Sequence, residues 1–126
     1  MYILLERIRV AKPRTLSMIN LTTHQELTDQ IKSNQAVLVL FGGINCGICQ
    51  AIKPQLQKLI GQNYPEMKTV YADCQTYPEL GAQASVFSLP VVRVYFEGQL
   101  FLEEVKAFSL GKLVADLERP YFLMLG

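Results

Sequence analysis

An unbroken apolar run, Ala36 to Phe41, sets the first limit on the fold, and the pair Gly42-Gly43 ends it. The run does not alternate between apolar and polar residues, so a strand formed here must be buried on both of its faces. Strands of this kind are typical of a parallel sheet that lies between layers of helices. The run therefore predicts a central strand of an α/β protein.

Helix and strand signals on either side of this run complete the pattern. Thr23 and Glu26 have the spacing of a capping box, which predicts that a helix begins there. Further strands are expected at 19–21, 69–72, 90–96 and 100–105, and further helices after Cys46, over 78–84 and after Ser109. We expect Pro54 to kink the second helix, Gly61 and Pro65 to end it, and Arg119-Pro120-Tyr121 to end the last helix. This alternation predicts a central mixed β-sheet flanked by helices on both faces.

Length, composition and charge exclude several classes of protein. The chain has 126 residues, which is the size of one domain, and 50% of them are hydrophobic while 18% are charged, so it is not intrinsically disordered. The net charge of +1 gives no reason to expect nucleic acid or an anionic membrane as a partner. The apolar runs are also too short for a helix that crosses a membrane.

Residues 1–17 differ from the rest of the chain in charge. The segment contains four basic residues and one acidic residue, Glu6, so its net charge is +3 while that of the remainder is −2. Glu6 and Arg7 interrupt the apolar run that begins at Tyr2, which leaves no signal peptide, and we expect a cytoplasmic protein. The segment is interpreted as a basic N-terminal extension before a domain of residues 18–126. Four interpretations of this segment stay open: a partner-binding arm, an extra strand, a loose tail, or a chain whose true start is Met18.

The chemistry is concentrated in Cys46-Gly47-Ile48-Cys49, between the buried strand and the second helix. Cys46 is expected at the N-terminus of that helix, where free N–H groups and the helix dipole favour the nucleophilic thiolate. Cys49 follows one turn later and is expected to be more buried, at a distance that allows a disulfide. The pair can therefore exchange disulfides with a substrate through a mixed disulfide. Gly47 is expected to allow a tight backbone and the close approach of a substrate chain.

A metal site is the main structural alternative for the Cys-x-x-Cys sequence. Structural zinc is held by four Cys or His ligands, and this chain offers only Cys74 and His24 beyond the pair. We therefore predict no metal, and no organic cofactor either, because the dithiol itself stores two electrons. We expect His24 to face solvent on the first helix and Cys74 to be a half-buried structural thiol. The odd number of cysteines fits a reducing compartment.

The order of these motifs resembles the thioredoxin family. The resemblance rests on the apolar strand at 37–41, Cys46-x-x-Cys49, Pro54 five residues later, Leu89-Pro90 and the Glu97-Gly98 turn. It extends from Ile19 to Leu117, and more narrowly it is a resemblance to small bacterial thioredoxin-like proteins with a CGxC centre. It implies the thioredoxin-like fold and protein-disulfide oxidoreductase activity.

The resemblance also implies roles for single residues. Cys46 would be the attacking thiol and Cys49 the resolving thiol. Pro90 would be the cis-proline that faces the dithiol and presents its neighbouring backbone to the substrate. The substrate-binding surface would comprise Asn45, Gly47, Ile48, Leu89 and Pro90. The implied partners are disulfide-containing substrate proteins and an electron donor of the thioredoxin-reductase type, and we expect the protein to be a monomer.

Several positions depart from the family pattern. Asn45 stands where the family usually has Trp, and Ile48 where thioredoxin has Pro. Leu40 occupies the position of the buried Asp beneath the dithiol, which should raise the pKa of Cys49 and slow the resolving step. Thr69 is interpreted as the replacement of a Lys on the next strand. Lys106 is interpreted as the replacement of a Gly near the end of the hairpin. These departures keep an alternative open: a redox-weak thioredoxin-fold protein-interaction module, docked through the basic segment or the 119–121 ending.

Overall fold

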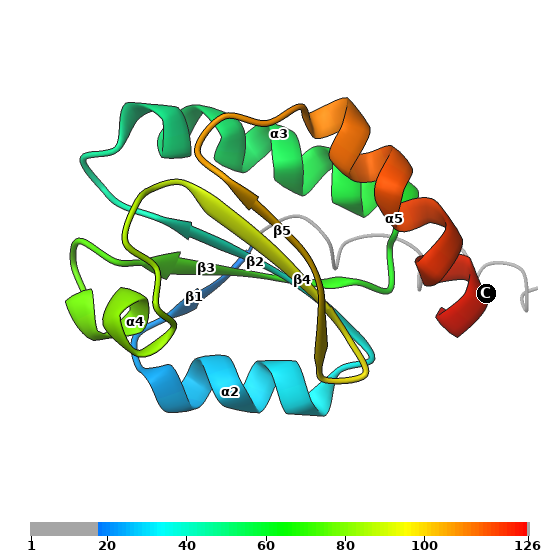
Figure 1. Ribbon diagram of the computed structural model, residues 1–126, viewed down its shortest axis with the longest axis horizontal. Helices are drawn as coiled ribbons and strands as arrows, with labels where there is room; N and C mark the ends of the chain where they lie inside the picture. The colour runs from blue at the N-terminus through cyan, green and yellow to red at the C-terminus, as the bar shows by residue number, and fades with distance from the viewer. Residues whose placement is uncertain (1–17, 126) are drawn as a thin grey trace, which may run out of the picture.

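The computed structural model describes residues 18–125, and the expectations for residues 1–17 lie outside this range. Figure 1 shows a single sheet with helices above and below it. Its strands are β1 (Ile19–Leu21), β2 (Ala36–Gly42), β3 (Lys68–Asp73), β4 (Val91–Phe96) and β5 (Gln99–Val105). Its helices are α2 (His24–Ser33), α3 (Gly47–Asn63), α4 (Pro78–Gln83) and α5 (Leu110–Leu125).

The sheet is mixed, as the element order predicts. Its strands lie in the order β1-β3-β2-β4-β5. β3 runs parallel to both β1 and β2, whereas β4 is antiparallel to β2 and to β5. The central strand is β2, and all seven of its residues are buried, which confirms the interpretation of the apolar run.

Alternate residues of β2 pack against two different helical layers. Ala36, Leu38 and Leu40 belong to a core cluster that includes side chains of α3 and α5. Val37, Val39 and Phe41 belong to the opposite cluster, which contains Leu27 of α2 and Leu80 of α4. Figure 1 shows the same division, with α3 and α5 on one face of the sheet and α2 and α4 on the other.

Two helix caps form as the sequence predicts. Thr23 caps α2 in a complete capping box with Glu26. Ser109 caps α5, because its Oγ accepts a hydrogen bond from the backbone N–H of Lys112 at 3.1 Å. His24 differs from expectation, since it is half-buried in the first turn of α2 rather than facing solvent.

One predicted helix end is confirmed and one is wrong. α3 ends at Asn63, between Gly61 and Pro65, whereas α5 continues through Pro120 to Leu125. A proline inside a helix removes one backbone donor, and tertiary contacts can compensate for that loss. Here Tyr121 is buried directly after Pro120, with its ring centroid 4.7 Å from that of Tyr64, and its hydroxyl accepts a hydrogen bond from the backbone N–H of Glu66.

Candidate active site

Cys46 and Cys49 form a disulfide at the start of α3. Their sulfurs are 2.11 Å apart and their Cα atoms 5.2 Å apart. Cys46 is half-buried, whereas Cys49 has no solvent exposure. The predicted difference in burial between the two cysteines is therefore confirmed.

The turn between β2 and α3 fixes the position of Cys46. Its backbone N–H donates to the carbonyl of Gly43 at 3.1 Å, and its own carbonyl accepts from Gln50 at 3.0 Å. Cys46 is the N-cap of α3, and its Sγ accepts a hydrogen bond from the backbone N–H of Cys49 at 3.2 Å. A sulfur in this place receives both a backbone donor and the positive end of the helix dipole, so the thiolate form of Cys46 is favoured there.

Gln75, in the turn after β3, holds the residue that precedes Cys46. Its Oε1 accepts a hydrogen bond from the backbone N–H of Asn45 at 2.6 Å. A Cβ at Gly43 would lie 2.3 Å from Cδ of Gln75, so a side chain at position 43 would displace the Gln75 side chain from this place. No sequence pattern indicates this role of Gln75, because it depends on a contact between two loops.

Asp73 organises the turn that carries Gln75. Its carboxylate accepts hydrogen bonds from the backbone N–H groups of Gln75 and Thr76, each at 3.0 Å, and from the Thr76 hydroxyl at 2.6 Å. Burial alone would raise the pKa of Asp73, but the hydrogen bonds from Thr76 and Gln75 stabilise the charged form and hold the pKa below its usual value.

A groove runs beside the disulfide. Its lining residues come from the start of α3, the Leu89-Pro90 bond and the segment after β5: Ile48, Ile52, Leu89, Pro90, Lys106, Ala107 and Phe108. The Leu89–Pro90 peptide bond is cis, as the resemblance implied. The carbonyl of Pro90 accepts a hydrogen bond from the backbone N–H of Lys106 at 2.7 Å. Lys106 has a φ of 64°, a conformation that favours glycine, and its side chain is exposed.

The structure brings three of the five predicted substrate-binding residues together in this groove: Ile48, Leu89 and Pro90. Asn45 and Gly47 are exposed on either side of Cys46. No atom lies within 4 Å of a Cβ built on Gly47, and its φ is not in the left-handed region. The chain's own backbone therefore does not require glycine at this position, contrary to expectation, and the space in front of it is open.

Tyr71, and not Thr69, lies next to Leu40. The register of β2 and β3 pairs Leu40 with Tyr71 and Leu38 with Thr69, so Thr69 is two residues away from the β3 position beside Leu40. Leu40 is fully buried, and Tyr71 is 5% exposed. A leucine and a tyrosine thus lie side by side in the core cluster that includes side chains of α3 and α5.

Cys74 is the free cysteine of the described chain and is half-buried, as expected. Burial, and secondarily the charge of Asp73, raises its pKa to about 11. A thiol with such a pKa is almost entirely protonated near neutral pH and is a poor nucleophile.

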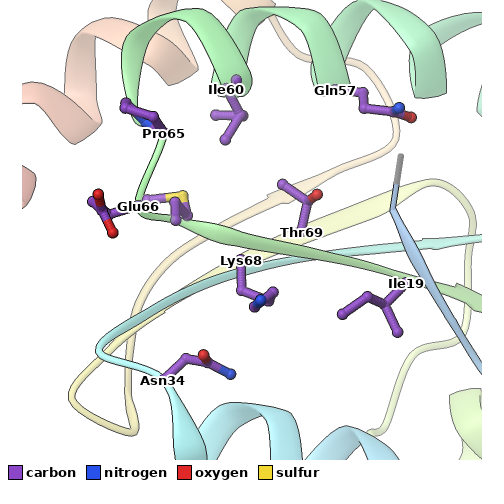
Figure 2. A pocket seen from close by; sticks show the side chains of 10 residues that line it. Ile19, Asn34, Gln57, Ile60, Pro65, Glu66, Lys68 and Thr69 are labelled. Carbon is purple, nitrogen blue, oxygen red and sulfur yellow. The ribbon is translucent and has the colours of Figure 1, made fainter. Parts of the chain in front are cut away.

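A second cavity lies at the opposite end of the sheet (Figure 2). It is lined by residues before β2, at the start of β3 and near the end of α3, including Asn34, Lys68, Thr69 and Gly61. The disulfide follows the carboxyl end of β2, whereas this cavity lies at the amino ends of β2 and β3. It is therefore separate from the candidate active site.

Between residues 18 and 125, no group of three or more His, Cys, Asp or Glu side chains is arranged to hold a metal ion. In the same part of the chain, no helix has the length and apolar character needed to cross a membrane.

The geometry defines a reversible dithiol at the start of a helix, next to a groove and a cis-proline. Such a pair carries two electrons and exchanges them with other disulfides, so the chain is a thiol–disulfide oxidoreductase. The family model described as Thioredoxin matches residues 18–119, and the chain belongs to that family.

Known relatives support this assignment. The chain is 32% identical over 103 residues to mitochondrial thioredoxin-3 of Saccharomyces cerevisiae. The aligned region covers 80% of each of the two chains. The crystal structure of that protein in its oxidised form matches with a TM-score of 0.68 and 28% identity, over 83% of this chain and 93% of the other. The bifunctional thioredoxin reductase/thioredoxin of Mycobacterium leprae is 28% identical over 99 residues, which are 79% of this chain and 22% of that protein.

Proposed function

We propose that the protein reduces disulfides in other proteins, with Cys46 as the attacking thiol and Cys49 as the resolving thiol. The observation that carries these roles is the contrast between the half-buried Cys46, at the N-terminus of α3, and the fully buried Cys49. The Cys46 thiolate attacks the substrate disulfide, forms a mixed disulfide and releases one substrate thiolate. Cys49 then attacks Cys46, which forms the intramolecular disulfide and releases the second substrate thiolate.

We propose that the substrate chain binds along Asn45, Gly47, Ile48, Leu89 and Pro90. The groove beside the disulfide supports this placement, because Ile48, Leu89 and Pro90 line it together. The open space at Gly47 supports it as well, since a substrate backbone can approach there without meeting a side chain. Asn45 is smaller and more polar than the Trp usual in the family, so the range of partners should differ.

The oxidised protein needs a two-electron donor to act again, and we propose a reductase of the thioredoxin-reductase type. The Mycobacterium leprae relative, which combines a thioredoxin and its reductase in one chain, supports this proposal.

We also propose that the protein carries electrons as a monomer in the cytoplasm, where a free Cys74 would stay reduced. The basic segment, residues 1–17, is proposed to be an extension of the domain formed by residues 18–126.

Trapping experiments with two serine variants test the roles of the cysteines. Cys49→Ser leaves the attacking thiol but removes the resolving one, so incubation with oxidised insulin should accumulate a covalent mixed disulfide. Cys46→Ser should accumulate much less, because Cys49 is buried. The measurement is the mass of the adduct on a non-reducing gel. Dithiothreitol should release the insulin chain from the adduct, which shows that the link is a disulfide. Equal trapping by both variants would contradict the assignment, and failure of the unaltered chain to reduce insulin would favour an interaction module without redox function.

A further inference from the structure

The region next to Cys49 contains a polar side chain that the proposed mechanism has not used. A Cβ built on Gly42 would lie 2.8 Å from Oη of Tyr71 and 2.9 Å from Cβ of Cys49. The hydroxyl of Tyr71 and the side chain of Cys49 therefore approach the same point beside the β2 backbone. Glycine at position 42 keeps that space free, because a Cβ there would lie too close to both groups.

The Tyr71 hydroxyl is held in place from α3. The side-chain amide of Gln50, the residue after Cys49, donates a hydrogen bond to Oη of Tyr71 at 3.3 Å. Nζ of Lys53 lies 3.9 Å from the centroid of the Tyr71 ring. Because Gln50 donates to the phenolic oxygen, the phenolic hydrogen is left available for another acceptor.

The surrounding groups keep Tyr71 protonated. Burial raises the pKa of Tyr71, and the charge of Asp73 raises it further, while the hydrogen bond from Gln50 lowers it. β2 contributes the apolar Leu40 at the position paired with Tyr71. Tyr71 therefore acts as a hydrogen-bond donor at neutral pH and not as a base.

The resolving step needs such a donor. Before Cys49 can attack Cys46, its thiol must lose a proton to water and become a thiolate in a site with no solvent exposure. A buried thiolate without a hydrogen-bond donor is unfavourable, and Leu40 cannot supply one. In the subsequent attack the Cys49–Cys46 bond forms, the bond between Cys46 and the substrate breaks, and the substrate leaves as a thiolate.

We propose that the Tyr71 hydroxyl, positioned by Gln50, donates a hydrogen bond to the Cys49 thiolate and so promotes the resolving step. Tyr71 keeps its own proton throughout and stabilises the negative charge of the Cys49 thiolate. Leu40, which is apolar, cannot stabilise that charge. This inference rests on the proposed function, because it concerns the second step of that reaction. It assigns to a β3 side chain a role that the sequence pattern did not indicate.

Stopped-flow reaction of the reduced chain with 5,5′-dithiobis(2-nitrobenzoate) separates the two steps. The first thionitrobenzoate is released when Cys46 attacks, and the second when Cys49 resolves the mixed disulfide. Reaction of the oxidised chain, in which only Cys74 is free among the described residues, measures the contribution to be subtracted. Both rates are followed from pH 5.5 to 9 for the unaltered chain, Tyr71→Phe and the control Tyr77→Phe, which removes a hydroxyl from an exposed tyrosine.

We expect Tyr71→Phe to slow the second release about tenfold at pH 7, as the loss of a hydrogen bond to a charged group would. The deficit should shrink as the pH rises, while the first release and the Tyr77→Phe control stay unchanged. An unchanged second release, or one slowed equally at every pH, would overturn the inference. If Tyr71→Phe does not fold, the variant Gln50→Leu, at an exposed position of α3, takes its place. Gln50→Leu must then show the same pH-dependent slowing of the second release. If that slowing is absent, the inference is overturned. A single release from the unaltered chain would instead show that the proposed function is wrong.

Discussion

Leu40 of β2 is paired with Tyr71 of β3, and both residues enter the reactivity that we propose for the buried Cys49. Leu40 is fully buried, so Leu40→Asp would place an ionisable carboxyl in the apolar core, at the position that the family resemblance places beneath the dithiol. We expect this carboxylate to accept the Cys49 proton and to accelerate the resolving step. The measurement is the second phase of the stopped-flow reaction, and Leu40→Asn is the matched control because it is polar but cannot take up a proton. No acceleration relative to Leu40→Asn would contradict the prediction.

The same substitution should destabilise the protein, because a carboxyl replaces a well-packed leucine. We expect a loss of about 3 kcal/mol at pH 7. Burial raises the pKa of such a carboxyl above its value in the unfolded chain, so the folded state tolerates its protonated form better. The destabilisation should therefore be smallest below about pH 4 and should grow as the pH rises. Urea unfolding at pH 4 and pH 7 measures this difference.

Single residues of the site differ in how far the sequence predicts them. Cys46 and Cys49 could be found because their spacing and the strand before them form a local pattern. Tyr71 could not, because its role depends on the register of β2 against β3. Successive side chains of a strand point to opposite faces, so Thr69 and Tyr71 share one face, and the hydrophobic pattern cannot distinguish a shift of two residues.

The last turns of α5 illustrate how tertiary contacts decide where an element ends. Pro120 predicts an end to the helix, yet α5 continues because Tyr121 is buried against Tyr64. We expect Tyr121→Ala to lower the free energy of unfolding by about 4 kcal/mol, as large-to-small changes in a core do. The neighbouring Phe122 is 54% exposed, so Phe122→Ala should cost less than about 1 kcal/mol and serves as the control. Urea unfolding curves give both values, and equal losses would show that Tyr121 does not anchor the helix.

Over the whole molecule, the fold could be predicted because element order, strand burial and helix caps agree. The unbroken run at 36–41 requires helices on both faces, and the structure supplies them. The relation between distant loops could not be predicted in the same way. The hydrogen bond between Gln75 and Asn45 joins the segment that follows β3 to the segment that follows β2. Neither segment has a sequence pattern that indicates contact with the other.

Exposed apolar side chains that are close in sequence to Cys46 and to the groove residue Leu89 lead to a prediction about large substrates. Ile44 and Ile48 flank Cys46 in the sequence, and Phe87 precedes Leu89 by two residues; all three are more than half exposed, with Phe87 at 87%. Contact with such side chains would favour unfolded polypeptides over small disulfides, because only a polypeptide buries them on binding. Phe87→Ser should therefore raise the KM for insulin several-fold. The rate with 5,5′-dithiobis(2-nitrobenzoate) should stay unchanged, because that small disulfide reacts with Cys46 and Cys49 without needing contact with Phe87.

Phe122→Ser is the matched control for this experiment, because Phe122 is also exposed but lies on α5, near Tyr64 at the far end of α3 from Cys46. Phe87→Ser should not change the free energy of unfolding, since its side chain has little buried area to lose. If both variants raise the KM alike, general surface hydrophobicity rather than a face around the disulfide governs binding. If neither does, substrate recognition depends on the groove between Ile48 and Pro90 alone, and the exposed ring of Phe87 does not contribute to it.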